Sequence, residues 1–233
     1  MQRLIRVLAA VGLAFAGPAF AGDSPVVVEL YTSQGCSSCP PADSIFKQIA
    51  ARPDVIALAL HVDYWDYIGW KDSFANPKFS ARQRAYAHAA GRRSIYTPQM
   101  IVDGVDNIVG VKPMKLVELV DAHRASPDLA TVTVERVGSQ VKIEAVAAGP
   151  MPSQGCVVQL VTYQPSATVE IGRGENAGRR LDYVNIVQEW LPLGEWNGQG
   201  TFSATAKVAA GTPVAVLVQQ KGYGAILGAA QAN

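Results

Sequence analysis

The sequence predicts an α/β domain followed by an all-β, sandwich-like domain. From Pro25 to about Ala125, apolar runs typical of strands alternate with segments typical of helices. After Ser126-Pro127-Asp128 the pattern changes to short, alternating, β-branched runs separated by Gly, Pro, Ser and Asn, the spacing expected of a β-sandwich. We therefore expect two domains, residues 22–127 and 128–233, after a separate segment at residues 1–21.

The first domain carries a separate signal for each element. Val26–Tyr31 and Val55–Val62 are apolar runs of strand length. A helix over Asn76–Ala90 is predicted by Asn76 as N-cap, Pro77 at its first position and Gly91 at its end. The expected order is β-α-β-α-β-β-α, over Val26–Tyr31, Cys39–Ala51, Val55–Val62, Asn76–Ala90, Pro98–Val102, Asp106–Val109 and Pro113–Arg124.

The second domain shows strand signals and no convincing helix. Its expected strands are Thr131–Val137, Val141–Ala147, Val157–Tyr163, Tyr183–Trp190, Thr201–Val208 and Val214–Gln219. Their apolar residues alternate with polar ones, as expected for strands that bury one face.

The first 21 residues have the layout of a secretory signal peptide. Arg3 and Arg6 precede an apolar stretch, Val7–Phe15, and Ala19-Phe20-Ala21 forms a small-residue cleavage site. The stretch is short for a membrane span of about 20 residues, and an uncleaved anchor is the alternative. Cleavage after Ala21 would leave 212 of 233 residues in the periplasm or outside the cell, where disulfides persist.

Composition excludes several function classes. Removing Arg3 and Arg6 lowers Lys+Arg from 20 to 18 against 19 Asp+Glu, and no basic run with interleaved aromatics predicts a nucleic-acid partner. No later apolar stretch is long enough to span a membrane, so no span is expected after cleavage. Three cysteines are too few for a disulfide-stapled scaffold.

The tetrad Cys36-Ser37-Ser38-Cys39 is the main candidate for chemistry. It opens a predicted helix, whose first-turn N–H groups and dipole favour a thiolate. A redox dithiol, a structural disulfide and half of a zinc site all fit this spacing. A bridge across two residues closes too short a loop to stabilise the fold much, which favours exchange chemistry. No His lies at ligand spacing, so no metal site is expected.

Longer motifs surround the tetrad. Three segments carry a family resemblance: Glu29–Asp43 (ELYTSQGCSSCPPAD), Tyr96–Gln99 (YTPQ) and Gly174–Asn176. Through these segments the chain resembles a bacterial family of secreted thioredoxin-like proteins that carries a domain-of-unknown-function label. The resemblance implies a thioredoxin fold with Thr97–Pro98 in cis against the dithiol. It also implies that Thr97 and Tyr96 present the substrate strand.

These observations predict an exported thiol–disulfide oxidoreductase that needs no cofactor. Cys36 would attack protein or small-molecule disulfides, Cys39 would resolve the mixed disulfide, and Pro98 would contact the substrate. Expected partners are thiol- or disulfide-containing proteins or small thiols. The alternative is a secreted binding or accessory protein with a static Cys36–Cys39 disulfide. A copper-handling protein is the third choice, because exported thioredoxin-like proteins include copper-delivery factors.

Four further features keep two interpretations each. Glu29 could accept a proton from the resolving thiol, or it could face solvent or an arginine. Cys156 could be an inert buried thiol or a redox partner. The aromatic run Tyr64–Trp70 is expected to pack, with lining of a groove as the alternative. The charged loop Gly172–Arg180 could form a domain interface or approach the dithiol.

Overall fold

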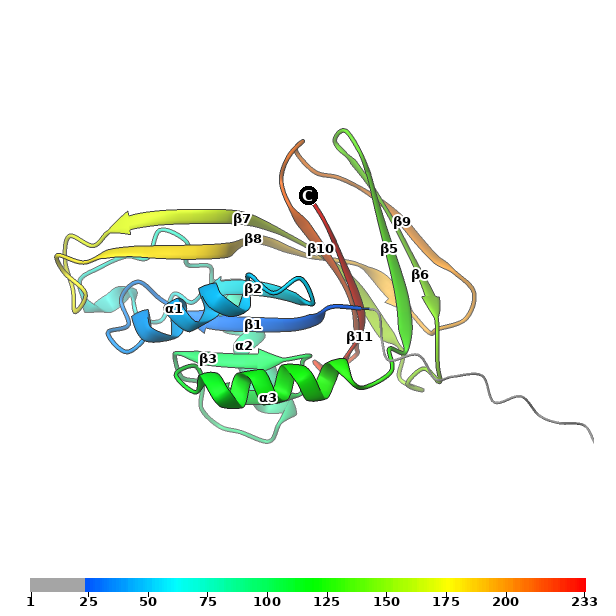
Figure 1. The fold of residues 1–233 in the computed structure, drawn as a ribbon, viewed down its shortest axis with the longest axis horizontal. Helices are drawn as coiled ribbons and strands as arrows, with labels where there is room; N and C mark the ends of the chain where they lie inside the picture. The colour runs from blue at the N-terminus through cyan, green and yellow to red at the C-terminus, as the bar shows by residue number, and fades with distance from the viewer. Residues whose placement is uncertain (1–23) are drawn as a thin grey trace, which may run out of the picture.

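A computed structural model describes residues 24–233, so the signal-peptide prediction lies outside the described part (Figure 1). The first half of this part contains β1 (Val26–Thr32), α1 (Pro40–Ile49), β2 (Val55–His61), the short 3-10 helix η1 (Asp66–Ile68), α2 (Pro77–Ala89), β3 (Gln99–Val102), β4 (Asp106–Val109) and α3 (Pro113–Arg124). The second half contains β5 (Ala130–Val137), β6 (Gln140–Ala147), β7 (Cys156–Glu170), β8 (Arg180–Trp196), β9 (Phe202–Lys207), β10 (Val214–Gln220) and β11 (Ile226–Ala232).

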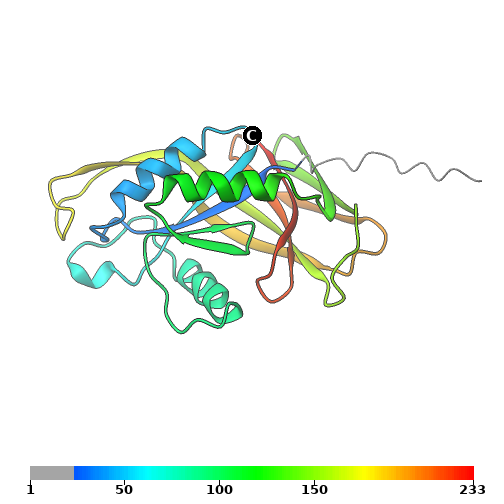
Figure 2. The same ribbon diagram turned by 60° about the horizontal axis from the view of Figure 1, so that its bottom comes forward.

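Helices cover both faces of β1 because its side chains alternate between two apolar cores. Val27 and Tyr31 join a core that includes Phe79 and Tyr86 of α2. Val26, Val28 and Leu30 join a second core with α1 and α3. Figure 2 accordingly shows α1 and α3 on one side of the sheet and α2 on the other.

The predicted fold class is wrong. Strands from both halves form one eight-stranded sheet in the order β11-β10-β7-β8-β2-β1-β3-β4. There is therefore no helix-flanked thioredoxin-like α/β domain followed by a separate β-sandwich. The pairs β1–β2 and β2–β8 are parallel, whereas the other neighbouring pairs of this sheet are antiparallel.

The two halves share one sheet because of β2 and the β7–β8 hairpin. All seven residues of β2 are buried, so its outer edge needs a partner rather than solvent. The hairpin supplies one, because β7 and β8 have 15 and 17 residues and extend well beyond the expected Val157–Tyr163 and Tyr183–Trp190. Ala59 of β2 pairs with Ile186 of β8, and this pairing joins the two halves.

A smaller sheet, in the order β5-β6-β9, packs on the other end of the large one. Its inward residues, such as Val141 and Ile143, share a third core with Val158 of β7 and Val216 of β10. Residue 127 falls between α3 and β5, and the division into domains at this residue stays a prediction. Within residues 24–233, no helix is long and apolar enough to cross a membrane.

The arrangement brings three segments that are distant in sequence together at one end of the sheet, where β1 and β2 terminate (Figure 1). The parallel strands β1 and β2 end side by side, with Thr32 opposite His61. The loop from β1 to α1 carries the two cysteines, and the loop from β2 to α2 starts next to it. The tip of the β7–β8 hairpin reaches the same end of the sheet, where the Asn176 side chain donates a hydrogen bond to the Gln34 carbonyl in the loop from β1 to α1.

Candidate functional site

Cys36 and Cys39 form a disulfide between the end of β1 and the start of α1. Cys39 is the N-cap of α1, and prolines occupy the first helical positions, where a missing N–H removes no helical bond. The side chains of Cys36 and Cys39 are 1% and 0% exposed. Ser37 and Ser38 between them are exposed, whereas the sulfurs are buried. The Ser38 hydroxyl also lies 3.3 Å from the Cys36 sulfur.

Side chains from distant segments hold the loop that carries the dithiol. The Asp72 carboxylate accepts a hydrogen bond from the backbone N–H of Gln34 at 2.8 Å. The Asn176 side-chain amide donates to the backbone carbonyls of Gln34 and Cys36 at 2.9 and 3.0 Å. The loop Gly172–Arg180 therefore approaches the dithiol, one of the two placements that the sequence left open. Asn176 is 1% exposed, so its amide is committed to this contact.

Thr97 contacts the dithiol directly. Its hydroxyl donates to the Cys36 sulfur at 3.2 Å and accepts from the Trp65 indole N–H at 2.7 Å. Because Trp65 supplies a proton to the hydroxyl oxygen, the Thr97 proton is directed at the sulfur. Trp65 also packs against the core, so the aromatic run both packs and supports the site.

Pro98 and Tyr96 flank this threonine. The Thr97–Pro98 bond is cis, as the resemblance implies. The Pro98 carbonyl accepts from the Gly110 amide at 3.0 Å, and the Tyr96 carbonyl accepts from Gln83 at 2.8 Å. Burial raises the pKa of the Tyr96 hydroxyl. The segment Tyr96-Thr97-Pro98 is thus fixed on both sides of its contact with Cys36.

Glu29 lies on the face of β1 that packs against α2, in an ion pair with Arg82. Arg82 donates to both carboxylate oxygens at 2.8 Å, and the hydroxyls of Tyr86 and Tyr31 donate at 2.6 and 2.9 Å. The Glu29 side chain is fully buried. An acid paired with an arginine is one of the alternatives that the sequence left open for this residue.

Asp43 is the buried acid on the dithiol helix, and the sequence reasoning did not single it out. Its backbone N–H donates to the Cys39 carbonyl at 3.0 Å, and residues four apart share one face of a helix. The Thr32 hydroxyl donates to one carboxylate oxygen at 2.8 Å, and the other oxygen is buried without a partner within residues 24–233. The four-residue spacing in CSSCPPAD was the available signal.

Burial raises the pKa of the Asp43 carboxyl to about 7. The electrostatic interaction with His61 opposes this rise in the pKa of Asp43. Burial and the neighbouring Asp43 in turn raise the pKa of the Tyr183 hydroxyl. His61 Nδ1 lies 2.7 Å from an Asp72 oxygen. His61 Nε2 and the Tyr183 hydroxyl are buried without partners in the described part. Buried titratable groups therefore concentrate around Asp43, in the first turns of the helix that Cys39 caps.

Cys156 belongs to a different part of the molecule. It begins β7, is fully buried in the core shared with the small sheet, and donates to the Trp196 carbonyl. Burial raises the pKa of its thiol, which lowers the thiolate fraction. Among residues 24–233, no group of three or more His, Cys, Asp or Glu side chains is placed to hold a metal ion.

Comparison with known proteins identifies one family and similar solved structures. A family described as "Protein of unknown function (DUF1223)" matches residues 27–219. A crystal structure of a protein from Agrobacterium tumefaciens is 31% identical, with a TM-score of 0.74 over 91% of this chain and 95% of that one. HBP35 of Porphyromonas gingivalis is 14% identical, with a TM-score of 0.62 over 91% of this chain and 75% of that one, and shares the fold alone. No curated protein matches.

The raised pKa of Asp43 predicts a stability change with pH. The folded state keeps the Asp43 proton up to about pH 7, whereas the unfolded chain releases it near pH 3.8. The contribution is therefore fully present below pH 3.8 and is lost as pH rises through 7, by up to about 4 kcal/mol. Asp43→Asn, which keeps the shape, should lack this loss. Urea unfolding of both proteins at pH 4 and 7.5 checks it, and parallel losses would contradict the prediction.

Proposed function

This chain belongs to the family described as protein of unknown function (DUF1223), and we propose that it is an exported thiol–disulfide oxidoreductase that acts through Cys36 and Cys39. The hydrogen bond from Thr97 to the Cys36 sulfur carries the proposal. A hydroxyl that donates to a sulfur stabilises its thiolate, because hydrogen bonds to a charged group are stronger than those to a neutral one. A purely structural bridge gains nothing from that preference.

The exchange proceeds in two balanced steps. The Cys36 thiolate attacks one sulfur of a substrate disulfide, which forms a mixed disulfide and releases the other substrate sulfur as a thiolate. The Cys39 thiolate then attacks the Cys36 sulfur, forms the intramolecular disulfide and releases the second substrate thiolate. Substrate gains two electrons and the protein loses two. The reverse sequence oxidises a substrate dithiol.

Asp43 accepts the proton of Cys39 in the second step. It lies one helical turn after Cys39, and a pKa of about 7 suits proton transfer near neutral pH. Glu29 does not suit this role, because both its oxygens are bound by Arg82 and by tyrosine hydroxyls. Thr97 holds the substrate strand: within residues 24–233, its backbone N–H and C=O have no partner and remain available to pair with an extended chain.

One observation favours the alternative of a binding or accessory protein with a static disulfide. Both sulfurs are almost completely buried, so a substrate reaches Cys36 only if a neighbouring segment moves. The following experiments separate the two functions.

Trapping of mixed disulfides tests exchange itself. In a Cys156→Ala background, which removes the third thiol, Cys39→Ser should accumulate mixed disulfides through Cys36. Cys36→Ser is the matched control and should not. Non-reducing gels with mass spectrometry of captured partners from the periplasm or culture medium supply the readout. If neither variant captures a partner, the oxidoreductase proposal fails.

Removal of the Thr97 hydroxyl should weaken the nucleophile. Thr97→Val should raise the pKa of the reduced Cys36 thiol by about 1–2 units, since a hydrogen bond to a charged group contributes about 1.5–3 kcal/mol. Thr97→Ser keeps the donor and is the control. The pH dependence of alkylation by iodoacetamide gives both values. Equal pKa values in Val and Ser variants would show that the hydroxyl does not act on the thiolate.

The two acids should affect different properties. Asp43→Asn should slow the resolution of a preformed mixed disulfide at Cys36 about tenfold or more, because proton transfer of this kind contributes about 10²–10⁴-fold. Glu29→Gln should leave resolution unchanged but destabilise the fold by about 3–5 kcal/mol, because Arg82 would be buried without its counter-ion. Stopped-flow release of a chromogenic thiol and urea unfolding measure these effects. Slower resolution in Glu29→Gln alone would assign the proton to Glu29.

A further inference from the structure

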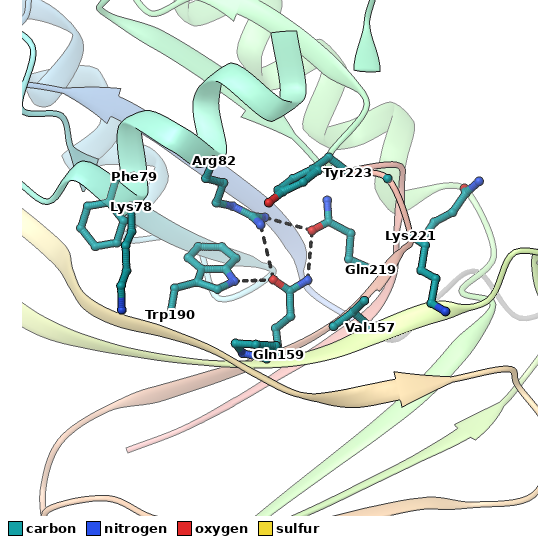
Figure 3. Close-up of a pocket in the computed structure, with 12 residues that line it drawn as sticks. Lys78, Phe79, Arg82, Val157, Gln159, Trp190, Gln219, Lys221 and Tyr223 are labelled. Carbon is teal, nitrogen blue, oxygen red and sulfur yellow. Dashed lines mark hydrogen bonds between the residues drawn. The ribbon is translucent and has the colours of Figure 1, made fainter. Parts of the chain in front are cut away.

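A cavity of about 350 Å³ lies between α2 and the strands β7, β8 and β10, apart from the dithiol (Figure 3). It is large enough for a small organic molecule. Figure 3 shows Trp190 and Gln159 on one side, Arg82 above them, and Tyr223 and Lys221 on the other side. From this cavity we propose that the protein binds a small anion with an aromatic body, of the class of aromatic carboxylates.

The charge of the lining selects an anion. It contains Lys78, Arg82 and Lys221 and no Asp or Glu. Arg82 is neutralised by Glu29 behind the wall, and Lys221 pairs with Glu195 at 2.5 Å. Lys78 is exposed and has no ion-pair partner within residues 24–233. A net positive charge thus remains at the mouth of the cavity, where a carboxylate would meet it.

The floor of the cavity is polar but its hydrogen bonds are already made. The Gln159 oxygen accepts from the Trp190 indole N–H, and its amide donates to Gln219 at 3.0 Å. Gln219 also accepts from Arg82 at 3.1 Å. Because most donors of the floor are already paired, the deepest part of the cavity favours an apolar group over a strongly polar one. Aromatic rings line the cavity: Tyr223 at the rim, and Trp190 with the Arg82 guanidinium stacked 3.7 Å from its ring centroid.

Tyr223 supports the assignment independently. It has φ of 61°, a left-handed conformation that favours glycine and is unfavourable for a bulky residue. It nevertheless places an aromatic ring at the rim of the cavity. Tyr223 is 40% exposed, and its ring packs edge-to-face on Tyr86 with the two ring centroids 5.6 Å apart. A glycine would suit the backbone better, so the side chain has a use at this position, and a wall for a planar ligand provides one.

Titration calorimetry with indole-3-acetate tests the proposal on the full mature chain. We expect saturable binding of one molecule per chain, and none of tryptamine, which has the same ring but a positive charge. Tyr223→Gly relieves the backbone and removes the ring, so a loss of affinity in this variant does not reflect unfolding. Lys78→Glu should weaken binding at least roughly tenfold, or about 1.4 kcal/mol. Lys142→Glu, an exposed lysine on β6, is the matched charge control and should bind normally.

Three results would overturn the proposal. The first is no saturable binding of indole-3-acetate at millimolar concentration. The second is equal binding of tryptamine, which would remove the preference for an anion. The third is unchanged affinity in both Tyr223→Gly and Lys78→Glu, which would place any binding outside this cavity. The dithiol is not involved, so these results are independent of the oxidoreductase proposal.

Discussion

Apart from Ser37 and Ser38, the dithiol loop is buried without regular secondary structure, and the need to pair its backbone polar groups organises the site. A buried N–H or C=O without a partner costs about as much as a lost hydrogen bond. Asp72 accepts a hydrogen bond from the backbone N–H of Gln34, and the Asn176 side chain donates to the backbone carbonyls of Gln34 and Cys36. The loop after β2 and the hairpin tip must therefore both reach the dithiol, and together they hold Cys36 beside Thr97.

The long hairpin connects this local need to the whole fold. Its middle pairs with β2, its tip supplies Asn176, and its far end joins the core of the small sheet. The same hairpin contributes Gln159 and Trp190 to the cavity under α2. One element thus takes part in the sheet, the dithiol environment and the second candidate site, and the two halves of the chain form one connected structure.

Local features were predictable, whereas long-range pairings were not. The sequence predicts the helix Pro113–Arg124 with the bounds that the structure has, and Asn76 caps α2 as expected. Capping and periodicity are local properties, so one sequence contains them. The pairing of Ala59 with Ile186 joins residues far apart in the chain and has no local signal. The contact of Asn176 with the dithiol loop depends on that pairing. The ion pair of Glu29 with Arg82 depends on how α2 packs on β1, so the sequence could offer an arginine as its partner but could not say which one.

The central claim is that Cys36 and Cys39 exchange electrons rather than simply hold a loop. Equilibration of the protein with glutathione buffers of known ratio measures the reduction potential of this couple. Structural disulfides in secreted proteins have potentials below about −300 mV. We predict a potential above that value, together with exchange with a protein disulfide. A potential far below −300 mV without any exchange would contradict the account and identify a static bridge.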